Sequence, residues 1–437
     1  MSGKFESWLY DDTPIKHKIV RIIFFLTSFS WTFNPHQDYT YSTGGPLLEK
    51  IVSRMIPMSI VAIYALTCEH RHLLKRLFRP GLWPLLWYVF FAVLCGVNSV
   101  QPALSAWKGA EIIIALMFFT VSCRDSISTR KELVAFIRLY EILLWWTVAL
   151  AIVQPTLGIR RSPSMLPWLQ GYLPVINPNA LGFISVFTIT RLLFLPARFK
   201  PVRLLFVAGT LICAQSRTSY AVTLVALLIY TIEGLRVRQF GRVIVTFMCA
   251  LVALGLAMGW HEMIMQVVMR GQTSAEMSSL SGRTDYWDYA LRYASWTGGG
   301  LATGSRSLIF ESDTAFIKGS VNMHNSFIEA VMGGGYIGAV PFIALLGINV
   351  LRQGVHALTR PSAFESLFFV CAIAFVARGM TSVVLAIFSA DFNNMMLLWY
   401  WLYTKDIGSD EKIIHLERPR PIAYEKTLIE QAQEASK

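Results

Sequence analysis

Long apolar runs recur along nearly the whole chain, and short polar segments separate them. A bilayer core about 30 Å thick needs about 20 apolar residues per helix. Of the 437 residues, 54% are hydrophobic and only 15% are charged, whereas soluble domains have about 25% charged residues. The pattern predicts an all-α polytopic membrane protein with about twelve transmembrane helices. The apolar runs lie near 19–33, 51–68, 82–98, 109–122, 132–154, 180–196, 204–214, 219–233, 243–260, 325–351, 367–388 and 393–404.

The distribution of Lys and Arg predicts the orientation, because basic loops stay on the cytoplasmic side. If both termini are cytoplasmic, that side holds 24 of the 39 Lys and Arg residues. The formal charge of +12 therefore reflects membrane topology, and we expect no nucleic-acid partner. The predicted organisation is a cytoplasmic N-terminus (1–18), helices 1–9 (19–260), an outward loop between helices 9 and 10 (261–324), helices 10–12 (325–404) and a cytoplasmic tail (405–437).

The segment 204–233 is short for two membrane helices, yet basic loops flank both of its ends. The chain must therefore go out and come back, with a turn at 215–219 near or below the outer surface. Polar backbone at that depth is tolerated only where it lines protein or a water-filled cavity. The Gln215-Ser216-Arg217 tip is thus either a ligand contact or an arginine that reaches towards lipid headgroups.

Two outward segments carry most of the polar chemistry. Residues 281–296 predict a helix that begins near Asp285 and lies at the membrane interface with its aromatic face on the bilayer, with Arg283 just before it. His324 lies at the mouth of the next membrane helix, and its ordinary pKa near 6.5 suits a general base. A helix-capping or interface histidine is the alternative interpretation. The glycines at 333–335 and Gly338 predict close helix packing.

The arginines of the outer face could form an anion clamp, because guanidinium groups bind phosphate in a bidentate manner. Arg217 and Arg283 are the main candidates. Arg160 and Arg161 could add to them, although a solvated loop is the alternative. Three further notable positions lie within apolar runs: Arg191 and Arg378, which are costly at membrane depth, and Arg138, which is three residues before Glu141 and could neutralise it.

Metal-site and P-loop motifs are absent from the sequence. There is no HExxH, no pair of CxxC motifs and no P-loop, so we expect neither metal nor nucleotide as a cofactor.

Five segments occur in the order typical of one family: INPNALG (176–182), QSRTSY (215–220), SGRTDYWDYA (281–290), GGGLATG (298–304) and HNSFIEAVMGGGYIGAVPF (324–342). Together they resemble the O-antigen ligase/polymerase superfamily, which includes O-antigen ligases, Wzy-type O-antigen polymerases and related exopolysaccharide polymerases. The resemblance covers roughly 175–350, and the twelve-helix topology extends it over the chain.

The resemblance implies a GT-C-like, metal-independent glycosyltransferase of the bacterial inner membrane. Its donor would be a saccharide on undecaprenyl pyrophosphate, and 261–324 would be a periplasmic catalytic loop. By position, His324 resembles the general base, and Arg217 and Arg283 resemble the pyrophosphate binders. Asn325 would orient His324 or the loop, Ser216 would support the tip, and Asn177 and Asn179 would be structural.

The acceptor stays open between two family members. A polymerase extends a lipid-linked repeat unit, for which a chain-length regulator is a conceivable partner, and a ligase transfers the chain to lipid A–core. Inversion at the anomeric carbon would need one base and no carboxylate pair. A flippase for lipid-linked oligosaccharides is the alternative from another class, and it predicts internal repeats and a site at the bilayer midplane.

Overall fold

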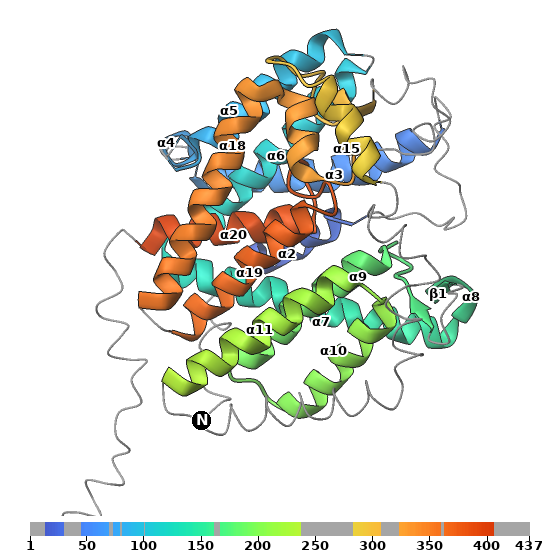
Figure 1. Cartoon of the computed structure of the whole chain (residues 1–437), viewed down its shortest axis with the longest axis vertical. Coiled ribbons are helices and arrows are strands. Elements are labelled where there is room, and N and C mark those ends of the chain that lie inside the picture. The colour runs from blue at the N-terminus through green and yellow to red at the C-terminus, as the bar shows by residue number, and fades with distance from the viewer. Residues whose placement is uncertain are drawn as a thin grey trace, which may run out of the picture.

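The computed structural model describes residues 14–29, 45–69, 73–78, 81–99, 101–160, 167–236, 283–306, 323–359 and 362–405. These residues form mainly helices joined by short connections (Figure 1). The bounds are α2 (Ile15–Thr27), α3 (Gly45–Glu69), α4 (Leu73–Leu77), α5 (Trp83–Cys95), η1 (Gly96–Asn98), α6 (Pro102–Ser122), α7 (Ser126–Val153), α8 (Pro155–Gly158), β1 (Ile159–Arg160), β2 (Trp168–Leu169), α9 (Pro178–Phe194), α10 (Lys200–Ala214), α11 (Arg217–Arg236), α15 (Arg283–Arg292), α18 (Ser326–Thr359), α19 (Ala363–Gly379) and α20 (Ala390–Lys405).

Each predicted apolar run within the described residues contains a helix, although the helix in 367–388 ends at Gly379, and the run at 243–260 lies outside the described residues. The mainly helical architecture of a membrane protein is therefore confirmed. Among the described helices, α6, α7, α11 and α18 are long and apolar enough to cross a bilayer by themselves. The total of twelve spans, the GT-C-like arrangement and the cytoplasmic location of both termini stay predictions.

The helices form two groups that meet at α19 (Figure 1). In one group, α9 packs against α7, α10 and α11, and in the other α18 runs along α5. Since α19 contacts α9 and α11 as well as α18 and α20, it joins the groups. Nearly every residue of α9 from Leu181 onwards is buried, as expected of a helix that is apolar on all sides.

Buried carboxylates tie distant helices together. The Glu132 carboxylate on α7 accepts hydrogen bonds from Arg21 of α2 at 2.8 and 2.6 Å. Glu141 accepts two from Arg203 at 2.6 and 2.5 Å and lies 3.8 Å from Arg191. Arginines from other segments therefore reach the Glu141 carboxylate, and its predicted neutralisation by Arg138 stays a prediction. Arg191 thus has a structural partner.

The helix α18 is broken inside its apolar run. Gly335 has φ +62° and ψ −176°, a conformation that L-residues with side chains avoid. The glycine-rich segment 298–304 fits against the break, where the N–H groups of Gly299 and Gly300 donate to the carbonyls of Met332 and Gly333, each at 2.9 Å. The backbone groups that the break releases are thereby paired, as membrane depth requires. Gly338 packs against Phe91 of α5, so close packing is confirmed there, whereas Gly335 has the different role of a break.

The predicted single helix over 367–388 is wrong in its second half. The helix α19 ends at Gly379, and residues 380–389 form an irregular connection to α20. Three of its backbone groups have partners from other elements: Arg283 donates to the Thr381 carbonyl, and Ser326 bonds to Ser382 and Leu385. Tertiary hydrogen bonds thus replace helical ones along this apolar stretch.

Candidate functional site

Four basic side chains come together from segments that are far apart in the sequence. They are Arg217 at the start of α11, Arg283 at the start of α15, His324 just before α18 and Arg378 in the last turn of α19. The positive charges of Arg378 and Arg217 act on Arg283, and those of Arg283 and Arg378 act on His324. The structure therefore brings together the three main predicted residues, Arg217, Arg283 and His324, and adds Arg378 to them.

The tip between α10 and α11 is built to present Arg217. Gln215 ends α10 in the left-handed conformation, with φ +49°, and Arg217 begins α11. Across the tip, the Tyr220 hydroxyl donates to the Ile212 carbonyl at 2.9 Å. The predicted break in 204–233 is thus confirmed, and the polar backbone at the tip is packed against protein.

Ser216 anchors this tip to α9. Its side chain is buried and its hydroxyl accepts a hydrogen bond from Ser219 at 2.8 Å. A Cβ at Gly182 would lie only 2.5 Å from the Ser216 Cβ, so the close approach of α9 and α11 requires glycine there. Asn177 caps the start of α9 through the Asn179 N–H at 2.9 Å. Ser216 and Asn177 therefore stabilise the framework that carries Arg217.

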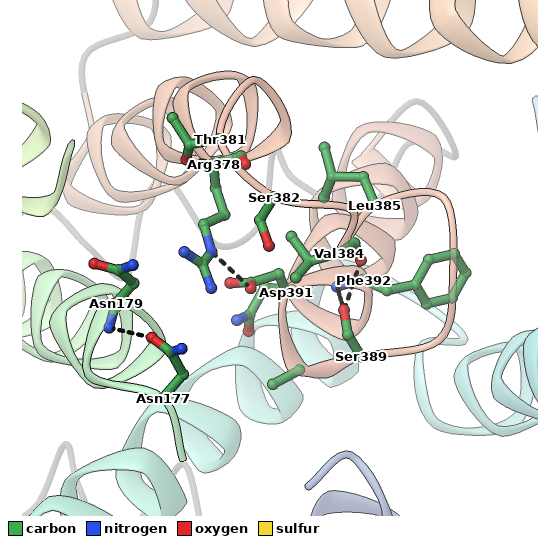
Figure 2. Close-up of polar contacts among 12 residues, drawn as sticks. Asn177, Asn179, Arg378, Thr381, Ser382, Val384, Leu385, Ser389, Asp391 and Phe392 are labelled. Carbon is green, nitrogen blue, oxygen red and sulfur yellow. Dashed lines mark hydrogen bonds and ion pairs between the residues drawn. The ribbon is translucent and has the colours of Figure 1, made fainter. Parts of the chain in front are cut away.

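Arg283 and Arg378 both contact the segment around α19 and α20. Arg283 Nη1 donates to the Thr381 carbonyl at 3.2 Å. Arg378 Nε donates to Asp391 Oδ2 at 3.3 Å, and its guanidinium lies 5.0 Å from the ring centroid of Phe183 on α9. Figure 2 shows the Arg378 side chain extending from the end of α19 towards Asp391. The Thr381 carbonyl and the Asp391 carboxylate thus hold the two arginines near the connection between α19 and α20.

His324 occupies an unusual backbone conformation immediately before α18. Its φ is +50°, which is uncommon for a residue with a side chain and persists only where the surroundings hold it. The next residue, Asn325, caps α18 through its side-chain oxygen, which accepts from the N–H groups of Phe327 at 2.9 Å and Ile328 at 3.3 Å. Asn325 thereby fixes the start of α18 directly after His324, and its predicted role in orienting His324 or the loop stays a prediction.

Part of the predicted aromatic face of α15 packs against the protein, and the position of this helix at the membrane interface stays a prediction. The aromatic face was expected on the bilayer, but Ala290 is buried in a cluster with Met323, Ile328 and Met332, against which Trp287 packs. The Trp287 indole N–H donates to the Met323 carbonyl at 2.8 Å. The described helix also includes Arg283 as its first residue. This face is used inside the protein because the loop before α18 offers both apolar surface and a carbonyl acceptor.

The electrostatics of the site favour an anion and a neutral imidazole. Burial, together with the nearby Arg283 and Arg378, lowers the pKa of His324 from 6.5 to about 4. Burial, together with Arg378 and Arg217, lowers the pKa of Arg283 from its ordinary value. An anion among the guanidinium groups would relieve this crowding of positive charge. At neutral pH His324 is thus unprotonated and able to accept a proton.

Two supporting residues stay predictions. Arg160 lies in β1, where its backbone pairs with Trp168, and nothing is described of its side chain. Arg161 lies outside the described residues, as does much of the loop 261–324. Within the part of the chain that the structure describes, no three His, Cys, Asp or Glu side chains are grouped to hold a metal ion. Metal independence stays a prediction as well.

Comparison with protein families supports the resemblance seen in the motifs. Residues 202–343 match the family described as O-antigen ligase. The match supports the placement of this segment in the O-antigen ligase/polymerase superfamily. The matched segment contains Arg217, Arg283 and His324, so the predicted site lies within it. A search of curated proteins found no significant match to the chain.

Part of the site lies outside the family match and was incompletely predicted. The sequence marks Arg378 only as a charge at membrane depth and does not single out Asp391. The signal that could have found the pair is a basic and an acidic residue at the two ends of one apolar stretch, 378–391. Buried ions are seldom placed without a partner, so these two were natural candidates for each other.

Proposed function

We propose that the chain is a membrane glycosyltransferase that moves a saccharide from undecaprenyl pyrophosphate to the hydroxyl of a sugar acceptor. The observation that carries the proposal is the placement of His324 beside Arg283 and Arg378 within a superfamily of O-antigen ligases and polymerases. One neutral base and a cluster of fixed cations are the two elements that such a transfer needs without a carboxylate pair.

The reaction proposed for this site is a direct displacement. His324 takes the proton of the acceptor hydroxyl while that oxygen attacks the anomeric carbon of the donor sugar. The bond between the anomeric carbon and the pyrophosphate oxygen breaks, and its electron pair leaves with undecaprenyl pyrophosphate. Arg217, Arg283 and Arg378 stabilise the charge that develops on this leaving group. One glycosidic bond replaces one glycosyl phosphate bond, with inversion of configuration.

Polymerisation of O-antigen or exopolysaccharide repeat units is the preferred version of this function. The preference rests on the motif SGRTD with its aromatic run and on the glycine-rich start of α18. Transfer to lipid A–core is the second candidate, favoured by the description of the matching family as O-antigen ligase. Both versions place the active site on the periplasmic side of the inner membrane.

The acceptor that is consumed separates these versions. Purified protein would be incubated in detergent with lipid-linked repeat units, with and without lipid A–core. The proposal expects lengthened lipid-linked chains and released undecaprenyl pyrophosphate. Products formed only with lipid A–core would mean a ligase. Movement of the lipid across vesicles with no new glycosidic bond would overturn the proposal in favour of a transporter.

A further inference from the structure

The helix α15 contacts two parts of the candidate site, the cluster of arginines and the backbone next to His324. Its first residue, Arg283, lies among the cationic side chains and donates to the Thr381 carbonyl. One turn later, Trp287 donates to the Met323 carbonyl, the peptide group that directly precedes His324. Residues four apart lie on the same face of a helix. The same face of α15 therefore contacts the anion-binding arginines and the backbone of the base.

Met323, the residue before His324, is held from a second side as well. The buried Glu329 carboxylate accepts the Met323 N–H at 3.4 Å and the Ser305 hydroxyl at 2.6 Å. Met323 is itself buried in the apolar cluster beneath α15. Both backbone groups of Met323 thus have partners, and the shorter bond of the two comes from Trp287.

These contacts matter because His324 has φ +50°. Such a conformation is costly for a residue with a side chain, which keeps it only when its neighbours impose it. The two hydrogen bonds of Met323 act on the residue before this strained position. The Asn325 cap acts on the residue after it.

We infer that Trp287 is a positioning residue for His324 and that α15 couples anion binding at Arg283 to the placement of the base. The inference rests on the proposed function, since it assigns His324 the role of the base. A donor pyrophosphate that orders Arg283 would also hold α15 against the loop, so that the imidazole meets the acceptor hydroxyl only when the donor is bound.

The main test compares two identical substitutions in one segment. Trp287→Phe removes the N–H and keeps an aromatic ring, while Trp296→Phe makes the same change at a side chain that is 73% exposed. Because a shift of about 1 Å at a catalytic group can cost about 100-fold, W287F should lower kcat by about 10- to 100-fold. The KM for donor should change less than about threefold, and W296F should match the wild type.

A double-mutant cycle separates positioning from general damage. If Trp287 acts through His324, W287F should cause little further loss of activity in the His324→Ala background, because residues that act as a unit are not additive. Additive losses would overturn the inference. Glu329→Gln is a second variant that weakens the other contact of Met323, and it should lower kcat in the same direction. Unchanged kcat in both W287F and E329Q would likewise overturn it.

Hydrogen–deuterium exchange tests the contact without relying on activity. W287F should speed exchange in peptides that cover 323–326, whereas W296F should not. If the wild-type protein forms no glycosidic bonds, the proposed function fails, and the exchange result alone then decides the positioning role. Unchanged exchange at 323–326 in W287F would overturn that role, even in an active enzyme.

Discussion

Arg378 and Asp391 form a buried ion pair at 3.3 Å across the irregular segment that joins α19 to α20. The pair brackets the backbone that contacts both Arg283 and the start of α18. Arg378 also lies within electrostatic reach of His324. The geometry of the anion site therefore depends on a residue pair that lies beyond the segment matched to the family.

Removal of Asp391 should destabilise the protein strongly. Asp391→Ala leaves the buried Arg378 without its carboxylate, a change that costs about 3–5 kcal/mol in comparable pairs. The control is Asp288→Ala, which breaks an exposed pair with Arg292 and should cost less than about 1 kcal/mol. Unfolding in mixed micelles measures both. Similar stability losses in the two variants would show that the 378–391 pair has no special role.

The activity should persist in mildly acidic solution. The pKa of His324 is lowered to about 4, so the imidazole stays neutral, and competent as a base, down to about pH 5. The acid limb of kcat/KM should therefore lie near pH 4, below the value of about 6.5 for an ordinary histidine. Arg283→Gln removes a nearby positive charge and should move this limb to higher pH. A wild-type limb at pH 6.5 would contradict the described surroundings of His324.

Gly335 and Gly347 provide a matched comparison within α18. A Cβ at Gly335 would lie 2.3 Å from the Trp296 carbonyl oxygen at φ +62°, whereas one at Gly347 meets nothing within 4 Å. Gly335→Ala should lower stability by about 1–3 kcal/mol or more, since a backbone with positive φ and extended ψ alone costs that much. Gly347→Ala should be neutral or stabilising by up to about 1 kcal/mol. Thermal unfolding measures the difference, and equal midpoints would argue against the break.

Gly182 should be required for activity because it allows Ser216 to approach α9. Gly182→Ala places a methyl group 2.5 Å from the Ser216 Cβ and should displace the adjacent Arg217. We expect kcat/KM to fall by about 10- to 100-fold. Gly209→Ala in α10 is the control, because nothing lies within 4 Å of its Cβ. If G182A keeps full activity, the Ser216 contact does not position Arg217.

Much of the helical framework could be predicted from the sequence, because bilayer-length apolar runs and basic loops are local signals. The tip at Gln215 and Ser216 was also predictable, since basic loops on both sides required the chain to turn. The grouping of Arg217, Arg283 and His324 followed from the family motifs rather than from their spacing.

The remaining features depend on contacts between distant segments. The break at Gly335 exists because residues 298–304 supply hydrogen bonds to the released carbonyls. The sequence pattern does not indicate that α19 ends at Gly379, because the apolar residues Val383, Val384 and Leu385 continue the hydrophobic run. The docking of Trp287 on Met323 likewise needs a partner 36 residues away, which composition cannot indicate.

The most direct test of the central claim is the formation of glycosidic bonds by purified protein supplied with lipid-linked repeat units. The wild type should form such bonds, and His324→Ala should lose at least about 100-fold of that activity while keeping its fold. Arg283→Ala should show a comparable loss, because a fixed donor to the leaving group is worth about 10²–10³-fold. Full activity in a folded His324→Ala protein would contradict the account.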